Sequence, residues 1–532
     1  MLNRITAWFR SANRQQWIYR VLLAIAVLGF AFAPVTGNGY TWLFWGGVAC
    51  FAFAARPSSK MHLSTIADWD LTKRLLSILV ALVTIACCIL PMDQLPLWNG
   101  EQPGHRNQYE LMADALLDGR IDFAYGDEDT LADLENPYDP GERKEAGVYY
   151  HWDHAYYNGK YYMYFGIVPV FLAFLPYKLF TGRSLTTYQG TQIFTALTIA
   201  GIFVLFHLLA KVFFKKMSFG VYLCLSVAFS VMSVWYSTAE PALYCTAITA
   251  ALALEVWSLY FFIRGVWYET KENQQLLYAG VGAFLGALVF GCRPPIALAN
   301  VLVIPMLITF LGQRKFSLKL LGKLALAALP YAVIGIALMM YNYVRFEDPF
   351  EFGQAYQLTV ADQSQYQLTL DKQTLLRLFN NTTSHLFGRS NISEAFPYLN
   401  TASVFANFPI LLLLGGIFKT EVLSGLRQTK TLPLIIGIAV TVLLITAVDI
   451  LWTPYLLERY RMDIYFLLGI GCFVILGFWQ DSCTLKNRKR FSTFLCLACL
   501  ATVVSSYLLC IKTVAVYYPD KVSEIARIFH LS

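Results

Sequence analysis

Charged residues are scarce in this chain: Asp, Glu, Lys and Arg make up 14% of its 532 residues, against about a quarter in a typical water-soluble domain. Hydrophobic residues make up 57%, and the mean hydropathy is +0.51. One water-soluble core cannot enclose so much apolar sequence. The composition therefore excludes an ordinary globular domain and indicates many membrane spans.

Histidine is also rare, with seven residues, and the eleven cysteines all lie in or beside apolar runs. Neither of the two long polar segments, 92–160 and 345–401, contains a cysteine, which excludes a disulfide framework there. Such cysteines are usually small apolar side chains of a packed core. We expect no cofactor and no metal site, although His151 and His154 flank Asp153 at a spacing of three and are possible ligands.

Apolar runs long enough to cross a bilayer as a helix recur along the chain. Backbone groups in lipid must be paired within their own segment, so these runs are predicted to be helices. They lie near 18–34, 40–55, 74–91, 188–211, 217–236, 241–263, 320–343, 402–418, 432–451, 461–480 and 491–511. Two shorter runs, 275–291 and 296–311, flank Arg293, Pro294 and Pro295, which predicts a helical hairpin or a sharply broken helix.

The segment 161–180 decides the predicted topology, because it is apolar but rich in Tyr and interrupted by Pro169 and Pro176. If it stays on one face, there are about 13 spans and the basic loops all fall on one side, as the positive-inside rule requires. If it crosses, every later loop inverts. We therefore expect an interfacial or re-entrant helix, a cytoplasmic N-terminus, and a C-terminus and polar segments on the outer face.

The predicted fold is an all-α polytopic membrane protein with about 13 transmembrane helices, an outer-face interfacial helix and two long outer loops. Its expected parts are N-terminal spans in 1–91, a first outer loop with interfacial helices in 92–187, a central bundle in 188–344, a second outer loop in 345–401 and C-terminal spans in 402–532. A multi-pass protein of the plasma membrane is the expected setting. The net charge of +7 then reports orientation in the membrane and not nucleic-acid binding.

The first polar segment holds fifteen acidic against five basic residues. Within it, Glu110, Asp114 and Asp118 are spaced one turn apart on a short predicted helix at 108–119. From periodicity alone, a solvated acidic face explains these carboxylates better than catalysis does. Glu110 and Asp114 nevertheless remain candidates for a catalytic base.

Asp153 is the strongest candidate for a base, because it lies in a run of aromatic residues, 148–169, that also contains Lys160. An interfacial aromatic belt accounts for most of the rings. A carboxylate among such rings is partly desolvated, which tends to raise its pKa and suits it to general-base catalysis. Perturbed carboxylates also occur in structural roles, so the two interpretations are evenly balanced.

Other candidates lie where apolar runs end. Glu240 precedes Pro241, and an acid at a helix entry can simply complement the helix dipole. Arg293, Arg459 and Arg461 also lie at predicted outer boundaries, where arginine often only reaches toward head groups. If these arginines converge, their guanidinium groups would form a clamp for a phosphate or diphosphate.

In their order along the chain, these features resemble the GT-C glycosyltransferases. The first similarity is a Y-x-x-x-A-x-x-L-x-x-G helix, here Tyr109, Ala113, Leu116 and Gly119, which is followed by an interfacial Pro-containing helix. The others are a G-x-R-P turn, here Gly291, Arg293 and Pro294, and a late E-R-Y motif, here Glu458, Arg459 and Tyr460. The resemblance covers most of 91–477 and is closest to the mannosyl- and aminoarabinosyltransferase branch. It implies a multi-span enzyme that uses polyprenyl-phosphate-linked sugars.

One departure concerns the base. That branch commonly has an Asp-Glu pair three to four residues before the loop tyrosine, and here His105 and Arg106 occupy those positions. Asp153 is therefore our predicted base, with Glu110, Asp114 and Glu240 behind it. The predicted substrate-binding residues are Arg293, Arg459, Tyr460, Arg461, Lys160 and Tyr109.

The expected activity is an inverting transfer of a sugar from a polyprenyl-phosphate donor to a glycan, lipid or protein acceptor of the cell envelope. An oligosaccharide polymerase or ligase, which also uses lipid-linked donors, is one alternative. A transporter or flippase is the other. It is less favoured because no internal repeat is evident and Asp449, Glu255 and His207 are the main titratable groups deep in or near predicted spans.

Overall fold

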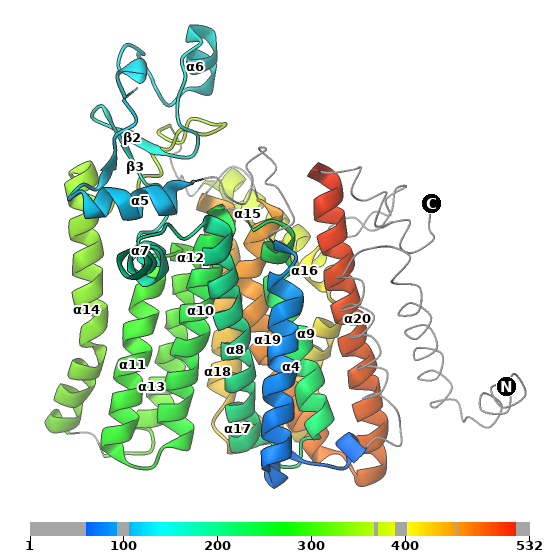
Figure 1. The fold of residues 1–532 in the computed structure, drawn as a ribbon. Coiled ribbons are helices and arrows are strands. Elements are labelled where there is room, and N and C mark those ends of the chain that lie inside the picture. Colours follow the sequence, from blue (N-terminus) through cyan, green and yellow to red (C-terminus); the bar gives the residue numbers. More distant parts are fainter. Residues whose placement is uncertain are drawn as a thin grey trace, which may run out of the picture.

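The structure is a computed structural model that describes residues 60–92, 106–126, 128–241, 243–315, 317–365, 371–388, 402–452 and 456–517. Long helices run side by side to form a bundle, and a smaller lobe containing α6 and the β-strands projects from one end of it (Figure 1). The first two predicted spans, 18–34 and 40–55, and His105 lie outside the described residues.

Ten helices in the described ranges are long and apolar enough to cross a membrane, or eleven if one bent pair counts as a span. All of them overlap apolar runs predicted from the sequence. They are α4 (Leu71–Ile89), α8 (Thr187–Phe213), α9 (Phe219–Ala239), α10 with η7 (Leu243–Ile263, Arg264–Tyr268), α11 (Glu272–Phe290), α12 with η8 and α13 (Pro294–Ala297, Leu298–Leu302, Val303–Leu311), α14 (Leu318–Phe346), α18 (Leu432–Trp452), η10 with α19 (Glu458–Arg461, Met462–Ser482) and α20 (Leu485–Tyr517).

The bent pair replaces the single span predicted at 402–418. The short helix α16 (Val404–Asn407) comes first, followed by a 3-10 helix, η9 (Pro409–Phe418), and then α17 (Thr420–Gln428). The last two helices meet at an angle of 76°. Pro409 begins η9 in a position where its missing N–H costs no helical hydrogen bond.

The centre of the bundle is formed by α9, α10 and α19. In the most apolar stretch of α19, 94% of the residues are buried inside the protein. In the corresponding stretch of α14, no residue is buried. Because α14 is apolar yet exposed along its length, it is a peripheral helix whose surface suits contact with lipid chains.

The turn between α11 and α12 is the hairpin expected around Pro294 and Pro295. Helix α11 ends at Phe290, and α12 begins at Pro294, so the prolines occupy the first turn of a helix where they are tolerated. Arg293 precedes them in an extended conformation, with φ of −152°. The turn lies at the end of the bundle that carries the polar lobe (Figure 1).

The polar lobe contains helices α5 (Gln108–Leu117) and α6 (Pro140–Ala146), the 3-10 helix η5 (Glu128–Leu131) and a small sheet. Strands β1 (Asp122–Phe123), β2 (Ala155–Tyr157) and β3 (Lys160–Tyr162) pair antiparallel in the order β1-β3-β2. Asn158 and Gly159 join β2 to β3, both with positive φ, as the tight turn of a hairpin requires. The all-helical prediction lacked this sheet, although the Asn-Gly pair between tyrosine-rich runs is a hairpin signal.

The second polar segment packs against the first. The Tyr156 N–H donates to Tyr356 O at 2.9 Å, and the Leu358 N–H donates to His154 O at 2.9 Å. Helix α15 (Lys372–Phe387) follows, at the same end of the bundle (Figure 1). Residues distant in sequence thus form one polar layer above the helices.

After β3, the segment 161–180 continues into a π-helix, η6 (Val170–Phe174), and then α7 (Leu175–Thr181). Together these form an apolar helix of 12 residues, about 18 Å long and too short to cross a bilayer. Helix α7 is seen along its axis in Figure 1, while the long helices run across the view, so α7 lies crosswise at the end of the bundle. This is the geometry expected of an interfacial helix.

Candidate active site

A cavity of about 450 Å³ lies between the polar layer and the bundle. Its walls come from both polar segments, from α10, α14 and α18, and from the Arg293 turn. The polar side chains that line it include Asp153, Tyr244, Arg293, Arg345, Gln357, Asp449, Arg459 and Tyr460. Four of the residues predicted from the sequence therefore line one cavity: Asp153, Arg293, Arg459 and Tyr460.

Asp153 is held in the cavity wall in a defined position. It is 4% exposed, and its φ of 56° is in the left-handed region, which Asp tolerates better than most residues. The Asp153 N–H donates to Leu358 O at 2.9 Å, and Gln108 Nε2 donates to Asp153 O at 3.0 Å. Both polar segments thus contribute to the unusual backbone conformation that directs this carboxylate into the cavity.

The Asp153 carboxylate accepts two hydrogen bonds, one on each oxygen. The Tyr244 hydroxyl donates to Oδ2, and Gln357 Nε2 donates to Oδ1 at 2.8 Å. Burial raises the pKa of Asp153, while these donors and the Arg459 charge oppose the rise by stabilising the ionised form. A desolvated carboxylate with hydrogen-bond donors on both oxygens has the chemistry of a general base.

Arg459 lies beside Asp153, with Tyr244 between them. Its guanidinium carbon is 3.9 Å from the centroid of the Tyr244 ring and 5.7 Å from that of Tyr460. Among the residues that the structure describes, no carboxylate lies within ion-pair distance of this guanidinium. A stacked arginine without an acidic partner at a cavity wall is suited to binding an anion such as a phosphate.

Arg293 differs from Arg459 because acidic residues already neutralise it. Its Nε lies 2.9 and 2.7 Å from the two carboxylate oxygens of Asp463, and its Nη2 lies 2.7 Å from Asp463 Oδ2. An oxygen of a second carboxylate, Asp449 Oδ1, is 4.0 Å from Nη2. Arg293 therefore lines the cavity as part of an ion-paired group and is less available to a phosphate than Arg459 is.

Arg345, at the end of α14, is a cation of the cavity that the sequence interpretation did not select. It is buried, donates from Nη1 to Met163 O at 2.8 Å and from Nη2 to Asn342 Oδ1 at 2.7 Å, and stacks on Tyr341. Within the described residues it has no carboxylate partner. Its position at the end of an apolar run, the criterion that selected Arg459, would have identified it.

Close packing joins the first polar segment to the Arg293 turn. The Val168 N–H donates to Gly291 O at 2.9 Å. A Cβ on Gly166 would meet the backbone of this turn, at 2.6 Å from Gly291 C and 2.7 Å from Cys292 O. Only glycine fits at position 166, and this contact holds the Asp153 segment and the Arg293 turn around the same cavity.

Glu110 lies away from the cavity and has a structural environment. Its carboxylate accepts hydrogen bonds from the N–H and hydroxyl of Thr187, the first residue of α8, and from the Asn107 N–H. It is 2% exposed, and burial raises its pKa to about 7 against the opposing effect of these bonds. The solvated acidic face predicted for this helix is therefore wrong for Glu110, which joins α5 to the N-terminus of α8.

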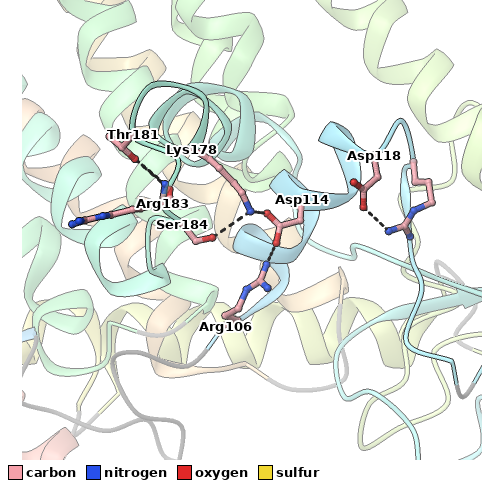
Figure 2. Close-up of polar contacts among 8 residues, drawn as sticks. Arg106, Asp114, Asp118, Lys178, Thr181, Arg183 and Ser184 are labelled. Carbon is pink, nitrogen blue, oxygen red and sulfur yellow. Dashed lines mark hydrogen bonds and ion pairs between the residues drawn. The ribbon is translucent and has the colours of Figure 1, made fainter.

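Asp114 also joins two elements. Arg106 and Lys178 both form ion pairs with its carboxylate (Figure 2). Lys178 belongs to α7, so the crosswise helix is held against α5 by charge as well as by the stacking of Tyr109 on Phe174, whose ring centroids are 5.2 Å apart. The pairing explains why an acid is stable at this position without any catalytic role.

The remaining predicted residues do not line the cavity. Glu240 is buried at the end of α9, where its Oε2 accepts a hydrogen bond from Tyr236. Tyr109 is fully buried in the core, and Lys160 is exposed at the hairpin. Arg461 is the last residue of η10 and directly follows the cavity residues Arg459 and Tyr460, but it does not line the cavity.

The residues described by the structure contain no group of three or more His, Cys, Asp or Glu side chains placed to hold a metal ion. His154, one of the two histidines considered as ligands, has its Nε2 2.8 Å from the Tyr125 hydroxyl. Burial lowers the pKa of His154 to about 3, so this imidazole is neutral and contributes to the packing of the lobe.

No protein-family model matches the chain, and a comparison with curated protein sequences finds no match. Among solved structures, the chain is similar to ArnT from Cupriavidus metallidurans bound to undecaprenyl phosphate, with a TM-score of 0.43 and 13% identity over 84% of this chain and 76% of that one. The apo state of that protein gives a TM-score of 0.44 with the same identity and coverage.

The chain is also similar to the oligosaccharyltransferase of Archaeoglobus fulgidus in its apo form. The TM-score is 0.45 and the identity 12%, over 83% of this chain and 56% of that one. Both likenesses extend over more than four fifths of this chain.

Proposed function

We propose that this membrane protein is a GT-C-type glycosyltransferase that moves a sugar from a polyprenyl-phosphate donor to an acceptor. One observation carries the proposal: Asp153 and Arg459 line the same cavity, and Tyr244 contacts both. A base and an anion-binding cation side by side are the two groups that such a transfer needs. The cavity lies at the end of the bundle, within reach of a lipid-linked substrate.

Arg459 is the proposed site of the donor phosphate. It is stacked and has no acidic partner among the described residues, so a phosphate would meet its unshared charge. Arg345 adds a second cation to the same cavity, and Arg293 and Tyr460 complete the wall. As the bond between the sugar and the phosphate breaks, the polyprenyl phosphate leaves with additional negative charge, which the arginine side chains stabilise.

Asp153 is the proposed base. An acceptor hydroxyl or amine attacks the anomeric carbon from the face opposite the phosphate, and its proton passes to the Asp153 carboxylate. One bond forms between the acceptor atom and the anomeric carbon, and the bond from that carbon to the phosphate oxygen breaks. A single displacement of this kind inverts the configuration at the anomeric carbon.

The proposed setting is the outer face of the plasma membrane. In the described part of the chain, the basic loops predicted from the sequence lie at the end of the bundle away from the polar lobe (Figure 1), which supports a cytoplasmic location for that end. The acceptor would then be a glycan, lipid or protein of the cell envelope that enters the cavity from the polar layer.

The experiment is transfer of radiolabelled sugar from polyprenyl-phosphate donors to membrane extracts by purified protein in liposomes. We expect transfer by wild type and loss of transfer in Asp153→Asn and Arg459→Ala. Asp133→Asn and Arg183→Ala are matched controls, because both residues are exposed, Asp133 in the polar lobe and Arg183 between α7 and α8, and neither lines the cavity. Absence of transfer by wild type from every donor would overturn the proposal and favour a transporter, whereas repeated addition to one acceptor would identify a polymerase.

A further inference from the structure

Asp449 is a buried carboxylate of the cavity that the proposed reaction does not use. It lies near the end of α18, is 3% exposed and is the only charged residue of that helix. It lines the cavity, yet its Oδ2 is buried without a hydrogen-bond partner in the described part of the chain. A buried acid that lines a cavity and has an oxygen without a partner is costly to the fold unless something binds it.

Arg293 does not supply the missing partner of Asp449, because its guanidinium already forms an ion pair with Asp463. Three contacts of 2.7 to 2.9 Å join Arg293 to Asp463, whereas its approach to Asp449 is 4.0 Å, the outer limit of an ion pair. Two carboxylates therefore share one arginine, which leaves either one excess negative charge or one bound proton in the cavity floor. In both states Asp449 can form one more hydrogen bond to a bound molecule.

The position of Asp449 relative to Arg459 indicates which molecule that is. The Tyr460 ring lies beside both arginines, with its centroid 4.9 Å from the Arg293 guanidinium carbon and 5.7 Å from that of Arg459. Asp449 is therefore connected to Arg459 through Arg293 and Tyr460, whereas Asp153 is connected to it through Tyr244. If the acceptor lies beside Asp153, the sugar of the donor can extend from the phosphate at Arg459 toward Asp449.

We infer that Asp449 is a specificity-determining residue that binds the sugar of the lipid-linked donor through one of its hydroxyl or amino groups. The inference rests on the proposed function, because it assumes that Arg459 holds the donor phosphate. A hydroxyl would share a neutral hydrogen bond with the carboxyl group, and an amino group would bring the positive charge that neutralises the Asp449, Asp463 and Arg293 group.

The test compares the affinity for undecaprenyl phosphate itself with that for undecaprenyl phosphate carrying glucose, mannose, galactose or their 2-amino-2-deoxy forms. Full-length protein in nanodiscs is used, as wild type, Asp449→Ala, Asp449→Asn and Thr446→Val. Thr446 is buried in the same helix, bonds to Val442 O within it and does not line the cavity, so it is the matched control.

In wild type, we expect at least one sugar to bind about tenfold more tightly than the bare lipid phosphate, the effect of one hydrogen bond to a charged group. Asp449→Ala should abolish this advantage and change binding of the bare lipid phosphate by less than about twofold. Asp449→Asn should retain part of the advantage if the group is a hydroxyl and lose it if the group is an amine. Thr446→Val should retain all of it.

The inference would be overturned if Asp449→Ala still bound the sugar-bearing lipid more tightly than the bare lipid phosphate by the wild-type factor. It would also be overturned if wild type bound no sugar-bearing lipid more tightly than the bare one. Neither result would contradict the proposed function. Failure of wild type to bind the bare lipid phosphate would instead count against the proposed function. The melting temperature separates a structural role from recognition. Removal of an unpartnered buried acid should leave it unchanged or raise it, and a fall of several degrees in Asp449→Asn would assign Asp449 to the support of Arg293.

Discussion

The Arg459 guanidinium stacks 3.9 Å from the centroid of the Tyr244 ring, and the hydroxyl of the same ring donates a hydrogen bond to Asp153. One side chain of α10 thus connects a cation that has no acidic partner among the described residues to a buried carboxylate. Because the two contacts use different parts of Tyr244, substitutions can separate them.

Tyr244→Phe should remove the donor to Asp153 while keeping the ring under Arg459. The hydrogen bond from Tyr244 opposes the rise in the pKa of Asp153 that burial causes, so its loss should raise that pKa further. A base must be ionised to act. The acidic limb of the transfer rate should therefore move to higher pH by about one pH unit, and the loss of rate should be greatest at low pH.

The pH profile of transfer by Tyr244→Phe and Tyr244→Leu measures this effect. The leucine variant also loses the stacking surface for Arg459, so its affinity for the donor should fall in addition. If Tyr244→Phe kept the wild-type pH profile, Asp153 would not be the group whose ionisation controls the rate.

Arg459 should be replaceable only in part by lysine. Arg459→Ala removes the charge that meets the leaving phosphate, and a loss of roughly 10² to 10³ in kcat is expected from the removal of one such group. Arg459→Lys keeps the charge but loses the planar fork and the stacking on Tyr244, so an intermediate loss is expected. Steady-state kinetics with Arg183→Ala as the control would show this order, and equal rates for Arg459→Lys and Arg459→Ala would contradict a role for the charge.

Glu110 should affect stability and leave transfer nearly unchanged. Its pKa is raised from 4.5 to about 7 in the folded protein, so the folded state loses stability relative to the unfolded chain as the pH rises from 4.5 to 7. Glutamine does not titrate. The melting temperature of Glu110→Gln minus that of wild type should therefore increase across this range, by an amount that corresponds to roughly 3 kcal/mol at most, and become constant at higher pH.

Thermal unfolding in detergent at several pH values tests this prediction, with Glu145→Gln, an exposed acid of the same lobe, as the control. Glu110→Gln should retain more than half of the transfer rate per folded molecule. A hundredfold loss of rate with an unchanged melting temperature would return Glu110 to the candidates for the base.

Gly166→Ala should disturb the cavity without altering any polar group. The added methyl group would overlap the backbone of the Arg293 turn at Gly291 and Cys292, which cannot move as a flexible side chain can. We expect a destabilisation of about 1–3 kcal/mol, typical of overpacking, together with loss of transfer. Gly335→Ala in α14 is the matched control, because a Cβ there meets no atom within 4 Å and alanine favours helix. Equal melting temperatures for the two variants would contradict the proposed contact.

The spans were predictable because lipid imposes a simple rule: each apolar run must be helical and long enough to cross. The same rule, through proline and charge, predicted the turn at Arg293 and the crosswise helix after Tyr161. It could not predict the sheet around Asn158 and Gly159, because its strands are only two or three residues long and are stabilised by pairing with each other and with the second polar segment.

Four cavity residues were identifiable from the sequence. Asp153 stands in a run of aromatic residues, Arg293 and Arg459 stand at the ends of apolar runs, and Tyr460 belongs to the E-R-Y motif. Their partners were not identifiable. The contacts of Asp153 with Tyr244 and Gln357 span 91 and 204 positions of the sequence, and no local pattern reports them. The pairing of Asp114 with Lys178 likewise depends on how α7 lies against α5, so the sequence could not distinguish it from a catalytic acid (Figure 2).

The most direct test of the account is a single-turnover experiment with Asp153→Asn and a preloaded polyprenyl-phosphate sugar donor. If Asp153 is the base and Arg459 holds the donor, the variant should bind the donor within about twofold of wild type. It should transfer the sugar at least roughly a hundredfold more slowly. Transfer at the wild-type rate by donor-loaded Asp153→Asn would contradict the assignment of the base and, with it, the central claim that this cavity is the active site.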